Sequence, residues 1–294
     1  MSSLQLIIDG ISLRILSFIN KLLPDTLYLK IKFKLKTGYS LNLRNPKTFN
    51  EKLQWLKLND RKELYPLLVD KANVKEYIKE TLGEEYLIKT LAVYDKFDEI
   101  DFSMLPDQFV IKCTHDSGGV VICKSKASFD IAKARKKINR SFKRNYFWVG
   151  REWQYKKIKP RILVEEYKED VSGGELKDYK LHCFNGDVKF CLVIGDRLKG
   201  STKMNFYDSQ WNLLPVKRHY PNFEENIPKP KTYDQMIQLA KRISKGIPFC
   251  RVDFYEINNK IFFGEITFFP GNGWEKFEPI EWDYKFGEWL NLEG

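Results

Sequence analysis

The segments Arg251-Val252-Asp253-Phe254 and Gly264-Glu265-Ile266-Thr267-Phe268-Phe269-Pro270-Gly271 carry the clearest structural pattern in this chain. They belong to two apolar runs, 249–257 and 260–268, which are rich in β-branched and aromatic residues. Asn258-Asn259 separates the two runs. Paired runs of this kind around a short Asn-containing turn predict a β-hairpin.

The hairpin contains two carboxylates in apolar surroundings. Asp253 and Glu265 each lie among β-branched and aromatic residues, where an unpaired carboxylate is costly. Cross-strand pairing can bring them to one face, which gives two adjacent hard oxygen ligands of the kind that Mg²⁺ requires. Because two such carboxylates repel each other without a cation, the pattern favours a metal site over a salt bridge.

Length and composition are those of a soluble protein with one or two globular units. The chain has 294 residues and a mass of 34.9 kDa, with 43% hydrophobic and 30% charged residues. Its net charge of +11 suggests a polyanionic partner: a nucleoside triphosphate, an acidic glycan, a nucleic acid or an anionic lipid. Surface lysine that serves only solubility is the alternative explanation.

The five cysteines have no C-x-x-C spacing, and most lie in apolar runs, so we expect reduced, buried side chains in a cytosolic protein. No apolar run approaches 18 residues, and the N-terminus lacks the features of a signal peptide. Residues 3–36 are apolar at helical spacing and then basic. They predict either an amphipathic helix on an anionic membrane surface or a helix packed on the core.

The remaining elements predict an α+β fold with antiparallel sheets. Thr48 and Glu51 form a capping box that opens a helix running to Lys57. We expect further helices over 69–80, 131–142 and 232–244, and strands over 109–113, 120–123, 161–167, 179–184 and 188–194.

A lysine beside a glycine loop is the second candidate site. Lys112 ends an apolar strand and precedes the loop His115-Asp116-Ser117-Gly118-Gly119. Flexible backbone N–H donors and a lysine charge together suit a triphosphate, although the chain has no Walker loop. A plain hairpin turn beside an ordinary lysine is the alternative, and a solvated lysine is the default for Lys71.

Two further charged segments follow. Glu165, Glu166 and Tyr167 end a strand, which is either a simple strand end or a hinge whose backbone contacts an adenine edge. Asp178 and Lys180 lie on one face of the next strand, either as an ion pair or as ribose and phosphate contacts.

Taken in order, these elements resemble the ATP-grasp superfamily, and in particular its TupA-like branch from teichuronopeptide biosynthesis. The resemblance covers nearly the whole chain. It rests on Asn45-Pro46-Lys47-Thr48-Phe49-Asn50-Glu51-Lys52, on Val69-Asp70-Lys71, and on the Lys112, Glu165-Glu166, Asp178-Tyr179-Lys180 and Glu265-Ile266-Thr267 segments. It implies two α+β lobes that clamp ATP between antiparallel sheets. The expected divisions are a helical segment (1–65), a first lobe with the glycine loop (66–164) and a second lobe with the metal site (165–294).

The resemblance also implies roles for individual residues. Lys71 and Lys112 would contact ATP phosphates, and the loop with His115, Ser117, Gly118 and Gly119 would cover them. The hinge residues Glu165, Glu166 and Tyr167 would hold adenine, Asp178 would hold ribose, and Lys180 would lie near the reacting phosphate. Asp253 and Glu265 would bind Mg²⁺.

One position departs from the family pattern. Most ATP-grasp enzymes carry Asn as the third metal ligand, two residues after the Glu, whereas this chain has Thr267. A hydroxyl can still coordinate a metal or position a metal-bound water, so a first metal is expected and a second is open. For the substrate carboxylate, Arg251 and Arg197 are the candidates, with ordinary surface or ion-paired arginine as the alternative.

The expected activity is ATP-dependent ligation of a carboxylate to an amine during bacterial surface-polysaccharide biosynthesis. The acidic partner would be a sugar or amino acid, and the enzyme would be cytoplasmic, with a peripheral membrane contact as an option. A glycosyltransferase and an ATP-dependent sugar kinase are the enzymatic alternatives. A basic nucleic-acid-binding protein is the non-enzymatic one, suggested by the mixed aromatic and basic residues 142–148 and not favoured.

Overall fold

The computed structural model describes residues 12–171, 176–196 and 200–292. Its helices are residues 12–19, α2 (Asp25–Thr37), α3 (Phe49–Asn59), α4 (Tyr65–Val69), α5 (Val74–Thr81), α6 (Ile131–Phe142), α7 (Phe147–Gly150), α8 (Tyr233–Ser244) and α9 (Glu281–Trp289). Its strands are β1 (Thr90–Tyr94), β2 (Phe109–Cys113), β3 (Val120–Cys123), β4 (Ile162–Glu166), β5 (Asp178–Phe184), β6 (Asp187–Gly195), β7 (Lys203–Asp208), β8 (Leu213–Leu214), β9 (Phe249–Ile257) and β10 (Lys260–Thr267).

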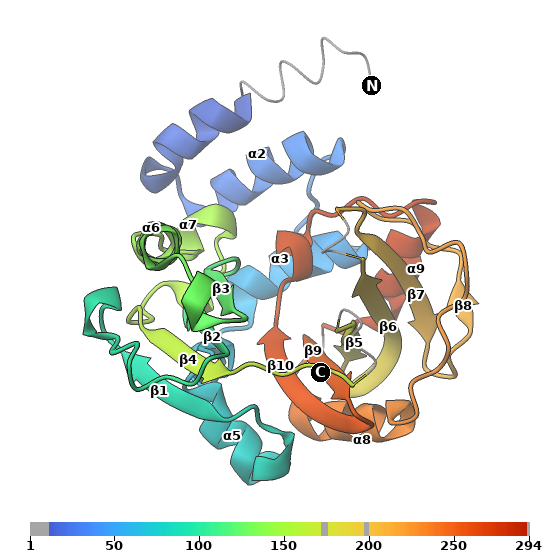
Figure 1. Ribbon diagram of the computed structural model, residues 1–294. Helices are drawn as coiled ribbons and strands as arrows, with labels where there is room; N and C mark the ends of the chain where they lie inside the picture. Colours follow the sequence, from blue (N-terminus) through green and yellow to red (C-terminus); the bar gives the residue numbers. More distant parts are fainter. Residues whose placement is uncertain (1–11, 172–175, 197–199, 293–294) are drawn as a thin grey trace.

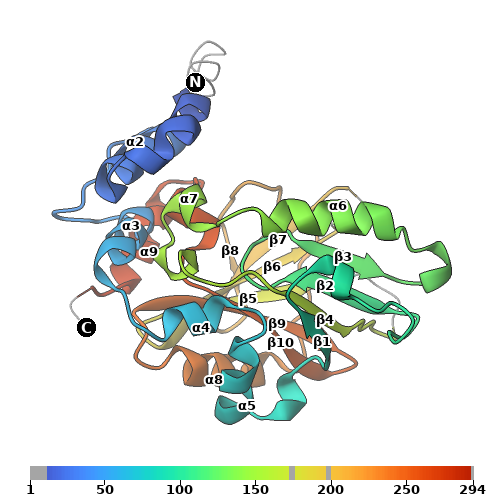
Figure 2. The same ribbon diagram turned by 90° about the vertical axis from the view of Figure 1, so that its left-hand side faces the viewer.

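The smaller sheet has four strands in the order β1-β4-β2-β3, all antiparallel. Helix α6 covers one of its faces (Figure 2). Phe109, Ile111, Ile162 and Val164 point to that face and pack with Ile138 of α6. Because strand residues alternate, Val110, Lys112, Leu163 and Glu165 face the other side.

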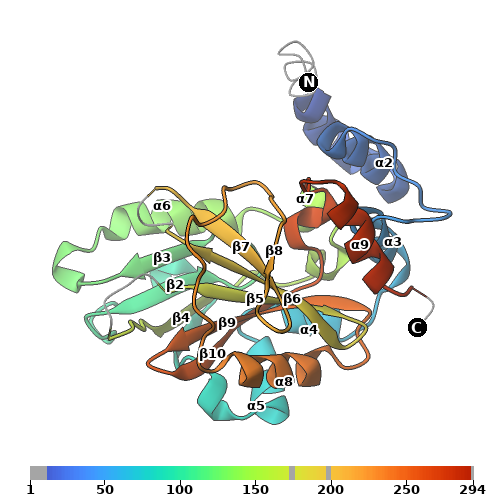
Figure 3. The same cartoon turned by 90° about the vertical axis from the view of Figure 1, so that its right-hand side faces the viewer.

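The larger sheet has six antiparallel strands in the order β10-β9-β5-β6-β7-β8. Helix α8 packs against its β5, β6 and β9 strands (Figure 3). The main apolar core lies here, and it also takes in side chains from α3, α4, α5 and α9. The predicted α+β architecture with antiparallel sheets is therefore confirmed, and Figure 1 shows the two sheets side by side. The three-part domain division stays a prediction.

Among the helix boundaries predicted from local sequence, the start of α3 is confirmed and the boundaries of one other helix are wrong. The capping box of α3 is present, with Thr48 accepting from the backbone of Glu51 and Glu51 accepting from the backbone of Thr48. The helix expected over 69–80 is wrong, because the chain breaks there into α4 and α5. Asp70 causes the break: its Oδ1 accepts from the backbone N–H groups of Ala72 and Asn73, each at 2.9 Å. This turn leaves Lys71 outside both helices.

Residues 12–37 form a helical extension with a small core of their own. Leu16 packs with Tyr28, Leu29, Phe33 and Leu41. Figures 2 and 3 show this extension standing away from the two sheets. In the part of the chain that the structure describes, every helix is too short or too polar to cross a membrane.

The structure also bears on the predictions for the cysteines and for the segment 142–148. All five cysteine side chains are free and buried. The aromatic and basic segment 142–148 does not lie on an exposed sheet face, because Phe147 and Trp148 belong to α7 and Phe147 is buried. This segment therefore does not form the exposed aromatic sheet face that the nucleic-acid hypothesis assigned to it, and the absence of a nucleic-acid partner stays a prediction.

Candidate active site

The open face of the larger sheet carries a row of charged residues. Strand register pairs Lys180 with Asp253 and Asp253 with Glu265, so these three side chains lie abreast on β5, β9 and β10. Arg251 pairs with His182 on one side and Thr267 on the other. The two carboxylates singled out in the sequence are thus neighbours on one face.

A β-bulge makes that neighbourhood possible. The hairpin register shifts between Phe263 and Glu265, leaving Gly264 as the extra residue. Without the shift, Gly264 would stand opposite Asp253 and Glu265 would turn to the other face. A Cβ at Gly264 would lie 3.1 Å from the Asp253 carbonyl oxygen, so the close approach favours glycine here.

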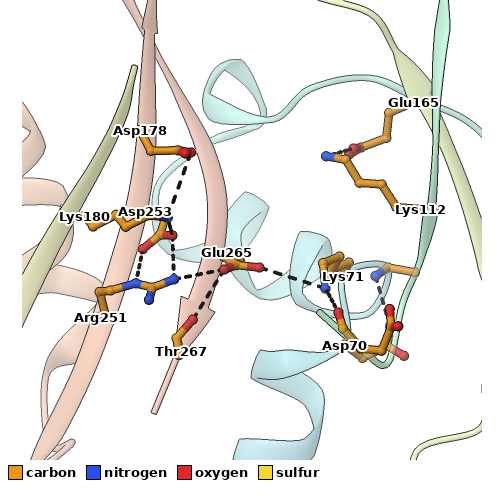
Figure 4. A network of polar contacts seen from close by, with 12 residues as sticks. Asp70, Lys71, Lys112, Glu165, Asp178, Lys180, Arg251, Asp253, Glu265 and Thr267 are labelled. Atoms are coloured by element: carbon orange, nitrogen blue, oxygen red, sulfur yellow. Dashed lines mark hydrogen bonds and ion pairs between the residues drawn. The ribbon is translucent and has the colours of Figure 1, made fainter. Parts of the chain in front are cut away.

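Basic side chains connect the carboxylates into one network (Figure 4). Arg251 donates from Nε to Asp253 Oδ1 at 2.6 Å and from Nη2 to Asp253 Oδ2 at 2.7 Å. The same Nη2 reaches Glu265 Oε1 at 3.0 Å. Lys180 also pairs with Asp253, and its Nζ lies 3.9 Å from Asp178 Oδ1. In this structure Arg251 is therefore occupied by protein carboxylates.

Burial and pairing act on these groups in opposite directions. Burial alone would raise the pKa of the Asp253 carboxyl, but Arg251 and Lys180 hold the pKa below its ordinary value. Burial alone would lower the pKa of Arg251, but Asp253 and then Glu265 raise it above its ordinary value. Asp253 is therefore ionised and Arg251 protonated at neutral pH.

Lys71 joins this network from the other side. Its Nζ lies 3.9 Å from Glu265 Oε2 and donates to the backbone oxygen of Asp116 at 2.6 Å. Its backbone N–H donates to Thr114 O at 3.1 Å. The turn between α4 and α5 therefore places Lys71 between Asp116 of the glycine loop and Glu265 of the β9–β10 hairpin, and Figure 4 shows its contact with Glu265.

Lys112 faces the same space from the smaller sheet. Its Nζ lies 2.6 Å from Glu165 Oε2, and Lys75 of α5 also pairs with Glu165. Burial alone would raise the pKa of Glu165, but Lys112 and Lys75 lower it. Glu166 points to the opposite face of β4 and pairs with Lys168 at 2.8 Å. Of the consecutive carboxylates, only Glu165 lies beside a predicted phosphate-binding lysine.

The glycine loop is anchored at its base. The side chains of His115 and Asp116 are buried, whereas Ser117 and Gly118 are exposed at its tip. Gly118 has a φ of 99°, and a Cβ at Gly119 would lie 2.7 Å from Asp116 Oδ1, so both positions favour glycine. Only the tip is placed to cover a ligand.

The remaining predicted residues are either untested or outside the described chain, and three charged residues near the site were not predicted. Arg197 lies outside the described residues, and the nucleotide roles of Glu166, Tyr167 and Asp178 stay predictions. The sequence analysis missed three charged residues near the site: Lys75, Glu152 and Arg218. Lys75 follows Lys71 by four residues, a spacing that could have revealed it, whereas Arg218 carries no local signal. Arg218 pairs with Glu275, and its charge acts on Arg251.

The donor set fits a nucleotide-bound Mg²⁺. Among the described residues, no cluster of three His, Cys, Asp or Glu side chains forms a metal site. Mg²⁺ nevertheless needs only one or two carboxylates when phosphates supply further oxygens. The Glu265 side chain is 38% exposed, and the Thr267 hydroxyl lies 3.5 Å from its Oε1. Asp253 would have to give up a hydrogen bond to Arg251 or Lys180 before it could bind the same metal ion as Glu265 and Thr267.

These features, two antiparallel sheets with lysines and carboxylates facing each other, define the ATP-grasp fold. Residues 51–291 match the family described as TupA-like ATPgrasp. The chain belongs to this family, and thus to a superfamily of ATP-dependent ligases. No curated protein matches the chain.

Solved structures of the same superfamily are similar at low identity. D-alanine–D-alanine ligase from Helicobacter pylori is 17% identical with a TM-score of 0.45, covering 82% of this chain and 69% of its own. The Bacillus anthracis D-alanine–D-alanine ligase complexed with ATP is 14% identical with a TM-score of 0.38, covering 68% and 53%. A RimK domain ATP-grasp protein from Sphaerobacter thermophilus is 12% identical with a TM-score of 0.41, covering 76% and 67%.

Glu265→Gln tests the metal pair most cleanly, since Glu265 is partly exposed. Loss of one ligand charge should weaken Mg²⁺-dependent nucleotide binding by more than about 10-fold. Calorimetry of ATP-analogue binding at a series of Mg²⁺ concentrations measures the change in affinity. Glu80→Gln, at an exposed position of α5, is the control. Asp253→Asn should also weaken it, but at a cost of about 3–5 kcal/mol in stability, because two buried cations lose their partner. Unchanged Mg²⁺ dependence in Glu265→Gln would refute the assignment.

Lys112→Ala tests the phosphate contact. Removing a charged donor should weaken nucleotide binding by about 10-fold or more, since hydrogen bonds to charged groups contribute about 1.5–3 kcal/mol. Glu165 keeps its pair with Lys75, so the fold should survive. The same calorimetry applies, with Lys137→Ala on exposed α6 as control. Equal affinities for Lys112→Ala and the control would make Lys112 an ordinary surface lysine.

Proposed function

We propose that this protein uses ATP and Mg²⁺ to join a carboxylate to an amine in the biosynthesis of a bacterial surface polysaccharide. The observation that carries the proposal is the position of Lys71 and Lys112 opposite the Asp253–Glu265 hairpin (Figure 4). Two lysines and two carboxylates around one space suit a polyanionic nucleotide and its cation.

The proposed reaction has two steps. A substrate carboxylate oxygen attacks the γ-phosphorus of ATP, which gives an acyl phosphate and releases ADP. The amine, which has given up its ammonium proton, then attacks the acyl carbon through nitrogen. The C–O bond to phosphate breaks, phosphate leaves with the electron pair, and the nitrogen passes a proton to the leaving phosphate to give the amide. Bound Mg²⁺ would neutralise charge on the phosphates, held by Glu265, Asp253 and Thr267.

The chain's own side chains would do the positioning. Lys71 and Lys112 would neutralise the transferring phosphoryl group from two sides, and Lys180 would stand beside it on β5. Arg251 would bind the substrate carboxylate by exchanging part of its contact with Glu265. Arg218, whose charge acts on Arg251, makes this end of the site more positive and so favours an acidic substrate.

The substrates follow from the family resemblance. An acidic sugar such as a uronic acid, amidated by an amino acid, is the proposed pair. A sugar kinase would use the same nucleotide site, so the product separates the two activities. A glycosyltransferase has less support, because the Asp178-Tyr179-Lys180 segment is not an Asp-x-Asp motif.

A screen of ATP consumption against uronic acids and amino acids, with mass detection of products, tests this function. We expect ADP, free phosphate and a product whose mass is that of the two substrates less one water. Glu265→Gln should abolish the product and so link it to the site. A phosphorylated sugar would establish the kinase instead, and consumption of a nucleotide sugar without ATP would establish the glycosyltransferase.

A further inference from the structure

Glu152 is a buried carboxylate that the proposed nucleotide site does not use. It lies between α7 and the 3-10 turn Trp153–Tyr155, with 3% of its surface exposed. Gln154 Nε2 donates to its Oε2 at 3.2 Å. No lysine, arginine or histidine nitrogen of the described chain lies within 4.0 Å of its carboxylate. A buried carboxylate without a bound cation is costly, so this position calls for an explanation.

The nearest candidate partner is already committed elsewhere. Lys57 is fully buried, and its charge acts on Glu152. A lysine ammonium has three donors. All three are used: by Gln54 Oε1 at 3.0 Å, by Gly150 O at 2.8 Å and by Asn272 O at 2.8 Å. Lys57 therefore acts on Glu152 only from a distance, and the donor that Glu152 does have is the neutral amide of Gln154.

The surroundings of Glu152 lead to the ATP-grasp site. The charges of Arg251 and Glu265 act on Glu152 and on the hydroxyl of Tyr155. Tyr146 and Tyr155 contact each other edge to face, with ring centroids 5.2 Å apart, and both are half-buried. Tyr146, Tyr155 and Glu152 thus lie together within electrostatic range of Glu265.

The segments around Glu152 include a turn fixed by hydrogen bonds and several buried polar atoms without partners. Gln54 Nε2 donates to Gly273 O at 2.6 Å and to Asn272 O at 3.0 Å, which fixes the turn that follows β10. Asn272 Oδ1, Gln154 Oε1 and Trp153 Nε1 are buried with no hydrogen-bond partner among the described residues. Because buried polar atoms are normally hydrogen-bonded, this group points to a polar ligand.

We propose that Glu152, flanked by Tyr146 and Tyr155, binds the ammonium group of the amine acceptor beside the Arg251–Glu265 end of the site. The inference rests on the proposed ligase function and adds the subsite for the attacking nitrogen. Carboxylate oxygens accept from an ammonium, and aromatic faces attract it. Burial raises the pKa of Glu152 to about 7 against the opposing effect of Lys57, and a bound ammonium would favour the ionised form.

Binding of a small amine tests the subsite without knowledge of the natural substrate. The probe is glycinamide, with N-acetylglycinamide as its uncharged counterpart, added to protein saturated with Mg²⁺ and a non-hydrolysable ATP analogue. Ligand-observed NMR should detect glycinamide but not its acetylated form. Glu152→Gln should weaken glycinamide binding by about 10-fold or more, as expected for a lost charged hydrogen bond, without changing analogue affinity. Glu281→Gln on exposed α9 is the matched control.

The outcomes separate the two proposals. Failure of the wild-type protein to bind the ATP analogue would overturn the ligase function itself. Normal analogue binding with equal glycinamide affinity in wild type and Glu152→Gln would overturn the subsite alone, as would absence of glycinamide binding to wild type. Should Glu152→Gln melt too early, Glu152→Asp and Tyr146→Leu replace it. The first withdraws the carboxylate by one methylene and the second removes one aromatic face, so unchanged glycinamide binding in both would refute the subsite.

A second, independent observation concerns the outward face of the N-terminal extension. Ile15, Phe18 and Leu22 follow one another at helical spacing and are 57%, 91% and 84% exposed. Leu27 and Ile31 of α2 are also exposed. The inner face, in contrast, is fixed to the body: the buried Arg151 pairs with Asp25 at 2.8 Å and lies over the Tyr28 ring.

The charge of the N-terminal extension indicates which kind of partner binds its exposed apolar face. Residues 12–37 contain six basic side chains and a single acidic one, Asp25, which Arg151 and Arg61 already neutralise. We propose that this face docks on an anionic lipid surface, inserting Phe18 and Leu22 while exposed basic side chains such as Lys30, Lys34 and Lys36 contact headgroups. Lys32 takes no part, because it donates to Val149 O of the body. Of the two sequence hypotheses, packing on the body describes the inner face, and membrane contact of the outer face stays a proposal.

Vesicle co-sedimentation tests the docking. The full-length protein should pellet with phosphatidylglycerol vesicles at low salt, not with phosphatidylcholine vesicles. It should be released in 1 M salt, where the Debye length is about 3 Å. Phe18→Ser with Leu22→Ser should reduce pelleting strongly without changing the melting temperature, since both residues are exposed. Leu213→Ser on β8 is the control. Absence of pelleting, equal pelleting with neutral vesicles, or a dimer that the double variant dissociates would overturn the proposal.

Discussion

The pairing of Arg251 with Asp253 and Glu265 is the interaction on which the site depends. Two carboxylates held abreast on neighbouring strands repel each other, and a guanidinium contacting both makes the arrangement tolerable. A buried ion network of this kind adds little net stability compared with apolar packing, yet breaking it is costly. Its effect is to fix geometry: β5, β9 and β10 keep their register because a slip would leave buried charges unpaired.

Glu265 extends this constraint to the smaller sheet. It lies between Arg251 and Lys71, and Lys71 is bonded to the glycine loop through Asp116 O. One carboxylate thus links the metal-site hairpin with the loop expected to cover phosphates. A triphosphate entering this space would compete with Glu265 for Lys71, and a metal ion would compete with Lys71 for Glu265. A nucleotide that binds Lys71 frees Glu265 for the cation, and a cation that binds Glu265 frees Lys71 for the nucleotide. Binding of the two ligands is therefore interdependent.

Local patterns in the sequence predicted much of this arrangement, and long-range contacts account for what they missed. The hairpin, the α3 capping box and helix α6 follow from residues close together in the chain. The break at Asp70 depends on one side chain capping its own backbone instead of continuing a helix. Strand β1 has little local signal, since it forms by pairing with β4 about 70 residues later. Asp253 and Glu265 were predicted as neighbours, but their pairing with Arg251 was not. The alternation of side chains along a strand shows which face a residue lies on, but it does not show the direction in which the arginine side chain extends.

The Asn-Pro-Lys-Thr-Phe-Asn-Glu-Lys segment illustrates the same limit. Read locally, it is a helix cap. In the fold, Asn50 donates to Glu275 O and to Asp283 Oδ2, each at 2.7 Å, while Gln54 and Lys57 bond the turn at 272–273. The three positions from Gly271, which lies four residues after Thr267, to Gly273 all have positive φ.

Helix α3 therefore clamps the segment that leaves the metal-site strand, in a conformation that residues other than Gly and Asn rarely adopt. Helix α3 thus holds the end of the site where Glu152 and Arg218 also lie, away from the predicted nucleotide contacts. Under the proposed function this end would receive the acceptor, so the geometry set by α3 bears on acceptor binding and not on the nucleotide.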